Sequence, residues 1–335
     1  MDAVRQIADA VLYEGYILWP YRRSAMKNRQ RWTFGGVYPR AHSEGRDDDP
    51  WEMRAECLLE GPGDAVVDVR VRFLQVVERQ VLAESAGGLV PVDELEVERE
   101  VYLTWEEARE REVAALGLGV GALDEPHEVE IDVPAASERE DLLDAEGVRA
   151  GAIERRWRPL VGRLEVAAVR RGPELWRLSA RISNESLWPG GHREDALKQT
   201  FASTHAVLRV EGGAFASLSD PPDHVREEAE ACRNQGCWPV PVGEPGDRST
   251  LLCSPIILED YPRVAPESPG DLFDGGEIDG LLTLSILGMT EEEKREMRAT
   301  DPRAREILER TEALGPEDLM RLHGTIREFQ SARRA

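Results

Sequence analysis

The chain has 335 residues, of which 41% are hydrophobic and 32% are charged. This composition is typical of a protein with a buried core and argues against a disordered chain. Aspartate and glutamate exceed lysine and arginine by 23, and this negative charge disfavours non-specific binding to nucleic acid or anionic lipid. We therefore predict no nucleic-acid partner.

The apolar stretch near the N-terminus is interrupted by Asp9 and Glu14, which the hydrophobic part of a secretion signal does not tolerate. No apolar run approaches the roughly 18 residues that a membrane-spanning helix requires. The four cysteines are too few for a disulfide scaffold, which fits a reducing compartment. We expect a cytoplasmic protein without a membrane span.

Residues 2–18 are predicted to form an amphipathic helix, because apolar side chains recur at intervals of three and four. Pro20 ends this helix, since the residue before a proline is disfavoured in the α region. The period then changes to two, and residues 53–59 and 67–73 are predicted strands. A turn at residues 62–63 predicts that these two strands form a hairpin.

The alternation changes phase in the second strand, where Leu74 and Val76 fall on the opposite parity and predict a β-bulge. Alternating runs over residues 95–103 and 129–133 predict two more strands. Between them, residues 104–113 are predicted to form a short helix, since they begin with the spacing of a capping box.

Residues 135–150 are polar and acidic, and we interpret them as a connection between domains. In a second β region, residues 164–168 are expected to pair with residues 176–182 across a Gly-Pro turn. Residues 206–210 and 215–218 are expected to form one more hairpin around two glycines.

The last quarter of the chain is predicted to be helical. Residues 278–287 are apolar on several faces and should be buried. Thr290 and Glu293 form a capping box for the next helix, and Pro302 and Pro316 mark the starts of two others.

Together these elements predict an α+β fold. It is mainly antiparallel β, sandwich-like, with an N-terminal helix and a helical C-terminal segment. We divide the chain into residues 1–135 with the first β region, residues 151–262 with the second, and residues 263–335 with an acidic loop and the C-terminal helices. This last region could pack with the β regions as one compact unit.

A basic, aromatic segment follows the first helix. Residues 19–38 carry five positive charges and no acidic residue. Arginine and aromatic side chains are enriched at protein–protein hot spots and also stack on nucleobases. Three interpretations stay open: pairing with carboxylates of the same chain, an acidic or protein partner, or nucleic acid. The candidate partner-binding residues are Trp19, Tyr21, Arg22, Arg23, Lys27, Arg29, Arg31 and Trp32.

Three cysteines and one histidine could supply the four ligands of a structural zinc site. Cys232 and Cys237 are separated by four residues, while His224 and Cys253 stand alone on either side. Ordinary buried or half-exposed thiols are the alternative interpretation. Cys57 lies on a predicted strand and is expected to be a small buried hydrophobe.

An acidic loop over residues 259–279 holds carboxylates between prolines and glycines. Such carboxylates can bind Ca²⁺ or Mg²⁺, but their spacing does not fit an EF-hand. Solvated, helix-capping carboxylates are the simpler interpretation, and a hydrolase that uses Asp271 and Asp274 is the alternative. The sequence lacks a Walker loop, a dinucleotide-binding fingerprint, a nucleophile elbow and a zincin motif, and it implies no cofactor. It therefore favours binding or assembly over catalysis.

Three stretches carry a resemblance to a known family. They are LWPYRRSAMKNRQRWTFGGVYP (residues 18–39), VRVRFLQVVERQV (residues 69–81) and SPIILEDYPRVAPESPGDLFDGGEID (residues 254–279). Together they resemble an uncharacterised protein family encoded beside actinobacterial-type NiFe uptake hydrogenases. The resemblance implies an accessory or assembly role, with hydrogenase subunits or maturation proteins as partners, and it implies no catalytic residues. A metal-binding accessory protein is the alternative, beside the hydrolase.

Overall fold

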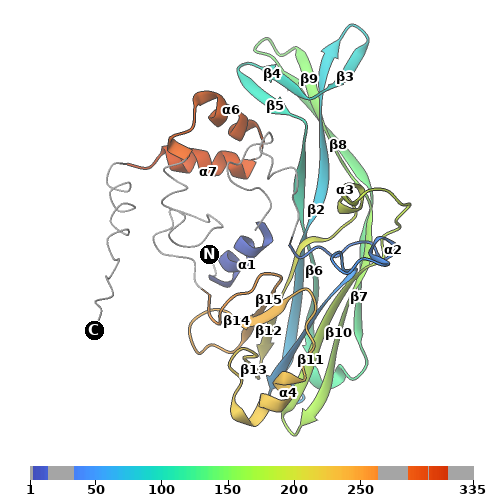
Figure 1. The fold of residues 1–335 in the computed structure, drawn as a ribbon, viewed down its shortest axis with the longest axis vertical. Helices are drawn as coiled ribbons and strands as arrows, with labels where there is room; N and C mark the ends of the chain where they lie inside the picture. The colour runs from blue at the N-terminus through green and yellow to red at the C-terminus, as the bar shows by residue number, and fades with distance from the viewer. Residues whose placement is uncertain (1–2, 14–33, 263–285, 301, 316–335) are drawn as a thin grey trace.

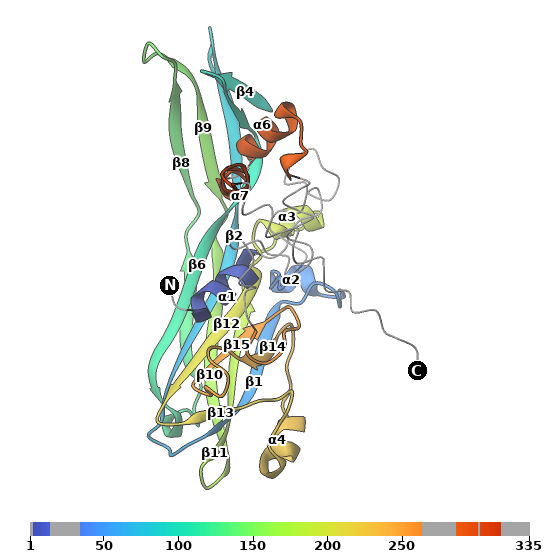
Figure 2. The same cartoon turned by 90° about the vertical axis from the view of Figure 1, so that its left-hand side faces the viewer.

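A computed structural model describes residues 3–13, 34–262, 286–300 and 302–315. Two antiparallel sheets pack face to face, and the main hydrophobic core lies between them (Figure 1). The predicted fold class, α+β with mainly antiparallel, sandwich-like sheet, is confirmed. Helices α1 (Ala3–Tyr13), α6 (Glu291–Thr300) and α7 (Pro302–Glu312) lie beside the larger of the two sheets (Figures 1 and 2).

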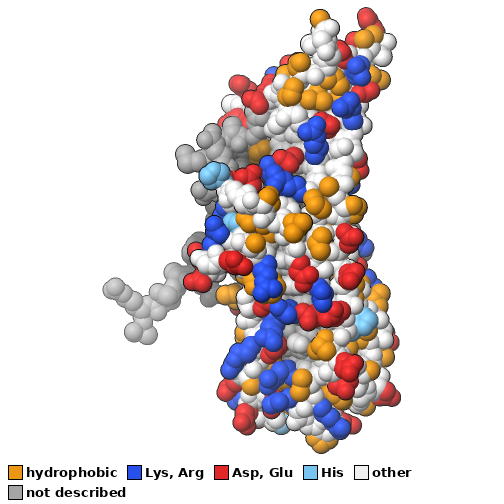
Figure 3. Space-filling view, turned by 90° about the vertical axis from the view of Figure 1, so that its right-hand side faces the viewer, with side chains coloured by type: hydrophobic (Ala, Val, Ile, Leu, Met, Phe, Trp, Pro, Cys, Tyr) orange, Lys and Arg blue, Asp and Glu red, His pale blue; other side chains and the backbone are white. Residues whose placement is uncertain are grey.

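The smaller sheet has five strands. Its order is β13 (Ala214–Ala216), β1 (Glu52–Glu60), β11 (Leu175–Asn184), β10 (Leu160–Gly172) and β7 (His127–Val133). The predicted pairing of β10 with β11 is confirmed, because Leu164 lies opposite Ile182. The outer face of this sheet is exposed along β10 and β11, where Arg181 pairs with Glu52 and Glu165, whereas residues 225–229 cover Leu58 of β1. Figure 3, which views the side of β7 and β10, shows basic and acidic side chains intermingled there.

The larger sheet has eight strands. Six of them are hydrogen-bonded to one another in the order β14 (Trp238–Pro241), β15 (Thr250–Ser254), β12 (Ala202–Glu211), β2 (Val66–Ser85), β9 (Arg149–Trp157) and β8 (Ala136–Leu143). β6 (Trp105–Gly119) and β3 (Gly88–Val92) pair with the other edge of β2. β2 is 20 residues long and is therefore shared by four neighbouring strands. A separate two-stranded sheet contains β4 (Glu94–Val97) and β5 (Glu100–Leu103).

The helices are short. They are α1 (Ala3–Tyr13), α2 (Arg40–Ser43), α3 (Arg193–Leu197), α4 (Arg226–Glu230), α6 (Glu291–Thr300) and α7 (Pro302–Glu312), with 3-10 turns at Val120–Ala122 and Asp223–Val225. The capping box of α6 is confirmed, since the Glu293 amide donates to Thr290 Oγ1 at 3.2 Å and the Thr290 amide donates to Glu293 Oε2 at 2.9 Å. The helix predicted at Pro316 lies outside the described residues. Within the described ranges, no helix is both long and apolar enough to cross a membrane.

The middle of β2, residues 71–77, is buried on both faces. The odd-numbered residues 67–73 face the core between the sheets. Leu74 and Val76 face the other side, where Leu12 of α1 and two residues of α3 cover them. The predicted bulge does not lie in β2 itself, because the register of β2 against β6 is continuous from residue 69 to residue 79. The register against β12 does shift opposite residues 72–74, with the extra residue in β12. The apolar parity changes because the strand contributes to two cores.

Two predicted hairpins are also wrong. The turn at residues 62–63 joins β1 to β2, and the turn at residues 211–213 joins β12 to β13, but each turn connects strands of different sheets. β1 pairs instead with β11 and β13. A turn motif shows where the chain reverses, whereas the pairing partner is chosen by the packing of the sandwich.

The helix predicted over residues 104–113 is a strand, β6. Its glutamates, alanines and arginines favour a helix, but pairing with β2 overrides this local preference. The Thr104 hydroxyl donates to the Val92 carbonyl at 2.7 Å instead of capping a helix. The run over residues 95–103 is a hairpin of β4 and β5, and it packs on Leu142 and Ile153.

Residues 135–150, which we interpreted as a connection, form β8 and the start of β9. Their charged side chains pair across strands, as Glu138 does with Arg109 and Glu140 with Arg155. The first β region supplies β1 and β7 to the smaller sheet and β2, β3 and β6 to the larger one. Strands of both predicted β regions are therefore interleaved in both sheets.

Arg79 of β2 attaches the C-terminal helices to the larger sheet. Its guanidinium is 8% exposed and pairs with Glu107 at 2.8 Å. It also donates to the carbonyls of Ala299 and Thr300, at 3.1 and 3.2 Å, at the end of α6. A cation at a helix C-terminus satisfies carbonyls that lack partners within the helix and offsets the negative end of the helix dipole.

We predict that Arg79→Met lowers the free energy of unfolding by about 2–3 kcal/mol, because it leaves buried acceptors unpaired. Hydrogen exchange should rise selectively in residues 286–315. Arg70→Met is the control: Arg70 pairs with Glu112 at the surface, both side chains being 45% exposed, and should lose less than about 1 kcal/mol. Equal losses in urea unfolding of the two variants would contradict the anchoring role of Arg79.

His205 of β12 is a buried titratable group in the larger sheet. Its Nδ1 lies 3.2 Å from the Ser203 carbonyl oxygen, while its Nε2 has no hydrogen-bond partner among the described residues. Ser203 adopts a φ of 52°, and the register of β12 against β2 shifts here. Burial, helped by the nearby Arg72, lowers the pKa of His205 from 6.5 to about 4, although the Ser203 carbonyl opposes this shift.

Because the pKa of His205 is lower in the folded state, the unfolded chain binds more protons between pH 6.5 and pH 4. We predict that the free energy of unfolding falls across this window, by a total of about 3 kcal/mol from this group. His205→Gln should flatten that part of the profile in urea titrations from pH 7 to pH 4. His127→Gln, at an exposed position, should follow the wild type, and an unchanged slope in His205→Gln would show that the histidine is not buried as described.

Candidate functional site

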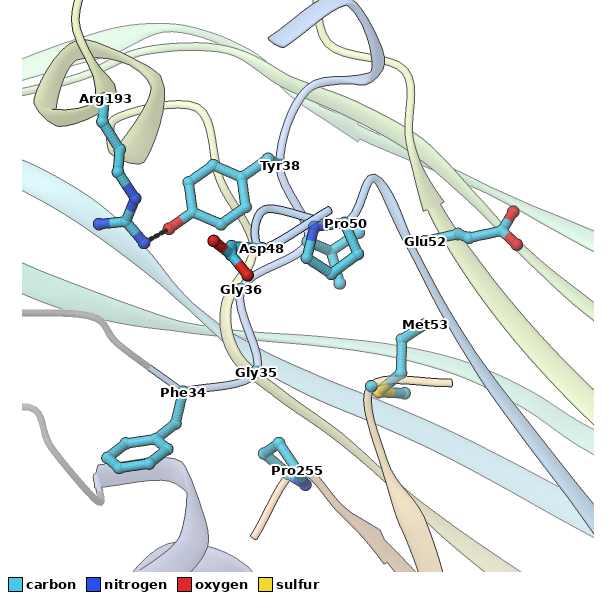
Figure 4. Close-up of a pocket in the computed structure, with 12 residues that line it drawn as sticks. Phe34, Gly35, Gly36, Tyr38, Asp48, Pro50, Glu52, Met53, Arg193 and Pro255 are labelled. Carbon is cyan, nitrogen blue, oxygen red and sulfur yellow. Dashed lines mark hydrogen bonds between the residues drawn. The ribbon is translucent and has the colours of Figure 1, made fainter. Parts of the chain in front are cut away.

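A pocket of about 240 Å³ opens where the first residues of β1 and α3 meet the end of β15. We name it the Arg193 pocket. Its lining residues are Phe34, Gly35, Gly36, Val37, Tyr38, Asp48, Pro50, Glu52, Met53, Arg193, Gly236 and Pro255. In Figure 4, Arg193, Tyr38 and Asp48 lie above the centre of the pocket, and Phe34 and Pro255 lie below it.

Residues 34–38 form one wall of the pocket and lie alongside the first residues of β12. The Val37 amide donates to the Phe201 carbonyl at 2.9 Å, and the Thr204 amide donates to the Gly35 carbonyl at 2.9 Å. Gly35 has a φ of 57°, and a Cβ there would lie 2.8 Å from Pro255 Cγ. Only glycine fits this conformation and this close approach, so the backbone itself forms part of the wall.

Arg193 is held in place by a buried carboxylate. Its Nε donates to the two oxygens of Asp49 at 3.0 and 3.2 Å, and one of its terminal nitrogens donates to the Tyr38 hydroxyl. Asp49, which is 4% exposed, also accepts from His42 Nε2 at 3.0 Å. Two side chains, Asp49 and Tyr38, thus fix one edge of the guanidinium, while the Arg193 side chain stays 47% exposed.

Electrostatics keep this network in one protonation state near neutral pH. Burial raises the pKa of Asp49, but the hydrogen bonds and charges of His42 and Arg193 outweigh it and hold the pKa below its ordinary value. Burial also raises the pKa of Tyr38 well above its ordinary value, in spite of the nearby Arg193 charge. Asp49 is therefore an anion and Tyr38 a neutral phenol, so Arg193 has a fixed donor pattern.

His42 is a buried member of this network and contacts both Asp49 and Tyr38. Its ring stacks on Tyr38 with centroids 5.3 Å apart and meets Trp188 edge-on at 5.5 Å. His42 is 1% exposed and does not line the pocket. It acts on the pocket through Asp49 and Tyr38, which it positions.

The lining offers binding groups. The Glu52 carboxylate is bound by Arg181 at 2.6 Å and points away from Arg193 (Figure 4). Asp48 is exposed and forms no ion pair with another described residue. No serine, threonine, cysteine, lysine or histidine is among the lining residues, so the described pocket contains no activated nucleophile. Its polar groups are a fixed guanidinium and a free carboxylate beside apolar walls.

Exposed apolar side chains occur on the pocket wall and two residues along the chain from two other lining residues. Phe34 on the wall is 42% exposed, and Trp238, two residues after Gly236, is 38% exposed. Ile257, two residues after Pro255, is 90% exposed. Grouped exposed aromatic and aliphatic side chains around a polar anchor are typical of protein-binding surfaces.

The predicted partner-binding residues lie outside the described residues. These are Trp19, Tyr21, Arg22, Arg23, Lys27, Arg29, Arg31 and Trp32. Asp271 and Asp274 of the acidic loop lie outside them as well. In the sequence, Phe34 follows the basic segment directly, so that segment is joined to the wall of the Arg193 pocket.

The predicted metal ligands are only partly brought together. His224 Nε2 lies 2.6 Å from Glu60 Oε1. Burial raises the pKa of Cys232 to about 11 and that of Cys237 to about 12, and both remain thiols at neutral pH. Among the described residues, no three or more histidine, cysteine, aspartate or glutamate side chains are arranged to hold a metal ion. The zinc site with Cys253 therefore stays a prediction.

Cys57 is fully buried, as expected, but it is not isolated. The charges of Cys232 and Cys237 contribute to raising its pKa, after burial itself, and Cys237 and Cys57 act in the same way on Cys253. Cys57 and Cys253 are both part of the hydrophobic core between the sheets, and Cys237 packs against that core. No spacing rule in the sequence links Cys57 to the other three.

The sequence did not single out His42, Asp49 or Arg193. Two local features of the sequence could have indicated parts of the site. The Gly35–Gly36 pair marks a close approach of the backbone. Asp195 lies three residues after His192, in a capping box that places Arg193 at the start of α3. These signals describe local turns. They do not show that the two segments, more than a hundred residues apart in the sequence, form one pocket.

No protein-family model matches the sequence, and no curated protein matches it.

We predict that Asp49→Asn destabilises the protein by roughly 2 kcal/mol at pH 7, because two charge-assisted hydrogen bonds are weakened. Urea unfolding checks this, with Asp47→Asn as the matched control, since Asp47 is exposed and next but one in the sequence. The control should change by less than about 0.5 kcal/mol. Equal midpoints for Asp49→Asn and wild type would contradict the network.

Proposed function

We propose that the protein is a non-catalytic accessory protein that binds a partner polypeptide through the Arg193 pocket. One observation carries this proposal: a half-exposed guanidinium is fixed on its inner edge by Asp49 and Tyr38, next to an apolar pocket. A side chain that is already ordered loses little conformational entropy when it binds, so it contributes more to affinity than a mobile surface arginine.

The mixed charge of the pocket favours a polypeptide. Arg193 presents donors on its outer edge, and Asp48 presents acceptors nearby. A polypeptide can supply a carboxylate and a basic group in the complementary order, together with an apolar side chain for the pocket. Nucleic acid offers phosphates, which Asp48 and the net charge of −23 repel.

We further propose that the partner is a NiFe hydrogenase subunit or a protein of its maturation, acting in the cytoplasm. The resemblance of the sequence supports this choice. Two of the three stretches that carry the resemblance supply lining residues of the pocket: residues 18–39 include Phe34 to Tyr38, and residues 254–279 include Pro255. The basic residues between Trp19 and Trp32 precede Phe34 in the sequence, and their charge suits an acidic partner.

The test is affinity co-purification of the tagged protein from its own host, read by mass spectrometry at low and moderate salt. We expect hydrogenase subunits or maturation proteins to be recovered, and less of them at moderate salt. Asp48→Arg and Phe34→Ser should each weaken binding of the recovered partner by about tenfold or more, which corresponds to about 1.4 kcal/mol.

Asp47→Arg is the matched control, because it makes the same charge change on an exposed neighbour that does not line the pocket. It should change the dissociation constant by less than about threefold. Recovery of the tagged protein alone would contradict a stable partner. Equal effects of Asp48→Arg and Asp47→Arg would exclude the pocket as the docking site.

A further inference from the structure

A second pocket, of about 280 Å³, lies at the end of the molecule where α6 and α7 pack beside the β4–β5 hairpin (Figures 1 and 2). We name it the helical pocket. Its lining residues are Arg99, Glu100, Val101, Glu291, Arg295, Arg298, Ala299, Arg305 and Glu309. It shares no residue with the Arg193 pocket.

Four arginines line this pocket from three elements. Arg295 and Arg298 lie on α6, Arg305 lies on α7, and Arg99 lies in the hairpin turn. On α6, Glu291, Arg295 and Arg298 are spaced by four and three residues and therefore share one face of the helix. The arginines converge because the packing of α6 against β5 brings that face to the hairpin.

Three of these arginines lack a carboxylate partner. Arg99 and Arg295 form no ion pair or hydrogen bond with any described residue, and Arg305 donates only to the Arg298 carbonyl, at 3.2 Å. Elsewhere in the described chain, arginines such as Arg72, Arg155 and Arg181 each contact two carboxylates. Other arginines, such as Arg170 and Arg233, also lack a carboxylate partner among the described residues, but here three such arginines line one pocket.

The acidic lining residues do not neutralise this charge. Glu100 accepts a hydrogen bond from the Tyr102 hydroxyl at 2.9 Å, and Glu291 lies 3.4 Å from Lys294. Arg298 is itself paired with Glu312 at 2.6 Å. Glu309 has no partner among the described residues and opposes the arginines. Glu100 and Glu309 therefore carry two negative charges against the three guanidinium groups of Arg99, Arg295 and Arg305, and the site stays net positive.

The turn that carries Arg99 is conformationally costly. β4 and β5 are joined by Glu98 and Arg99, whose φ values are 52° and 73°. Such a two-residue turn favours asparagine and glycine, because other residues are strained at positive φ. Glu98 has a structural use, since its Oε1 accepts the Ala145 amide at 2.9 Å. Arg99 has no hydrogen bond or ion pair with a described residue that would offset the strain, and its side chain lines the pocket.

We propose that the helical pocket binds a small oxyanion, a phosphate or a carboxylate group, held by the guanidinium groups of Arg99, Arg295 and Arg305. Guanidinium groups bind such oxygens through paired, charge-assisted hydrogen bonds, and convergence from three elements suits a small multidentate anion. A ligand there would bridge the hairpin and the two helices. Binding would therefore also stabilise the attachment of α6 and α7 to the sheet.

The test uses the full chain and isothermal titration calorimetry with inorganic phosphate, pyrophosphate and citrate, at ionic strength matched with sodium chloride. We expect saturable binding of at least one anion. Preference for pyrophosphate would identify a phosphate ligand, and preference for citrate a carboxylate one. Arg295→Gln should weaken binding by about tenfold or more. Absence of saturable binding to all three anions would overturn the proposal.

Two further variants keep the result interpretable. Arg233→Gln is the matched control, because Arg233 is exposed, lies outside the helical pocket and, like Arg305, donates from its side chain only to backbone carbonyls. It should bind the anion as the wild type does. Arg99→Gly should raise the melting temperature without ligand by about 2 °C, since it relieves the positive φ, and it should weaken anion binding. Equal anion affinity of Arg295→Gln, Arg99→Gly and Arg233→Gln would overturn the assignment of this pocket.

Discussion

The pairing of β2 is the constraint on which the rest of the structure depends. This strand of 20 residues is hydrogen-bonded to β12 and β9 along one edge and to β6 and β3 along the other. Its inward side chains at residues 67–73 build the core between the sheets, and Leu74 and Val76 build a second core under α1 and α3. Farther along, Arg79 binds the end of α6. One strand thus fixes the sandwich, the N-terminal helix and the C-terminal helices.

Contacts between arginines and carboxylates position many of the charged side chains of this acidic protein. Where an arginine is buried, as Arg79 is, it satisfies carbonyl and carboxylate groups that would otherwise be costly to bury. Where the carboxylate is buried and the arginine half exposed, as in Asp49 and Arg193, the pair presents a fixed donor pattern to solvent. In the helical pocket Arg99 and Arg295 lack such contacts with described residues. The burial of each arginine and the presence of a carboxylate partner, rather than the number of charges, distinguish a structural ion pair from a candidate binding group.

The candidate site was much less predictable than the fold. Arg193 and Asp49 are 144 residues apart, and neither belongs to a recognised motif. Their contact exists because residues 34–38 pair with the start of β12 and because α3 begins just before it. The sequence drew attention instead to the basic segment that precedes Phe34. The charge of that segment differs from that of the rest of the chain, so it can be recognised in the sequence. His42, Asp49 and Tyr38 have no such signal, because only their contact in the folded chain makes them a network.

The sequence by itself determined the α+β class, the strands with one apolar face, the β10–β11 hairpin, and the starts of α6 and α7. Each of these depends on periodicity or on capping within a few residues, which local physics specifies. Only the tertiary structure decided that residues 105–119 form a strand, that two turns cross between sheets, and that β8 and β9 occupy the expected connection. The tertiary structure also brings together the distant residues that line the Arg193 pocket and the helical pocket. Long-range pairing with β2 outweighs helix propensity, because a continuous ladder of hydrogen bonds and buried side chains stabilises more than the few tenths of a kcal/mol per residue that propensity contributes.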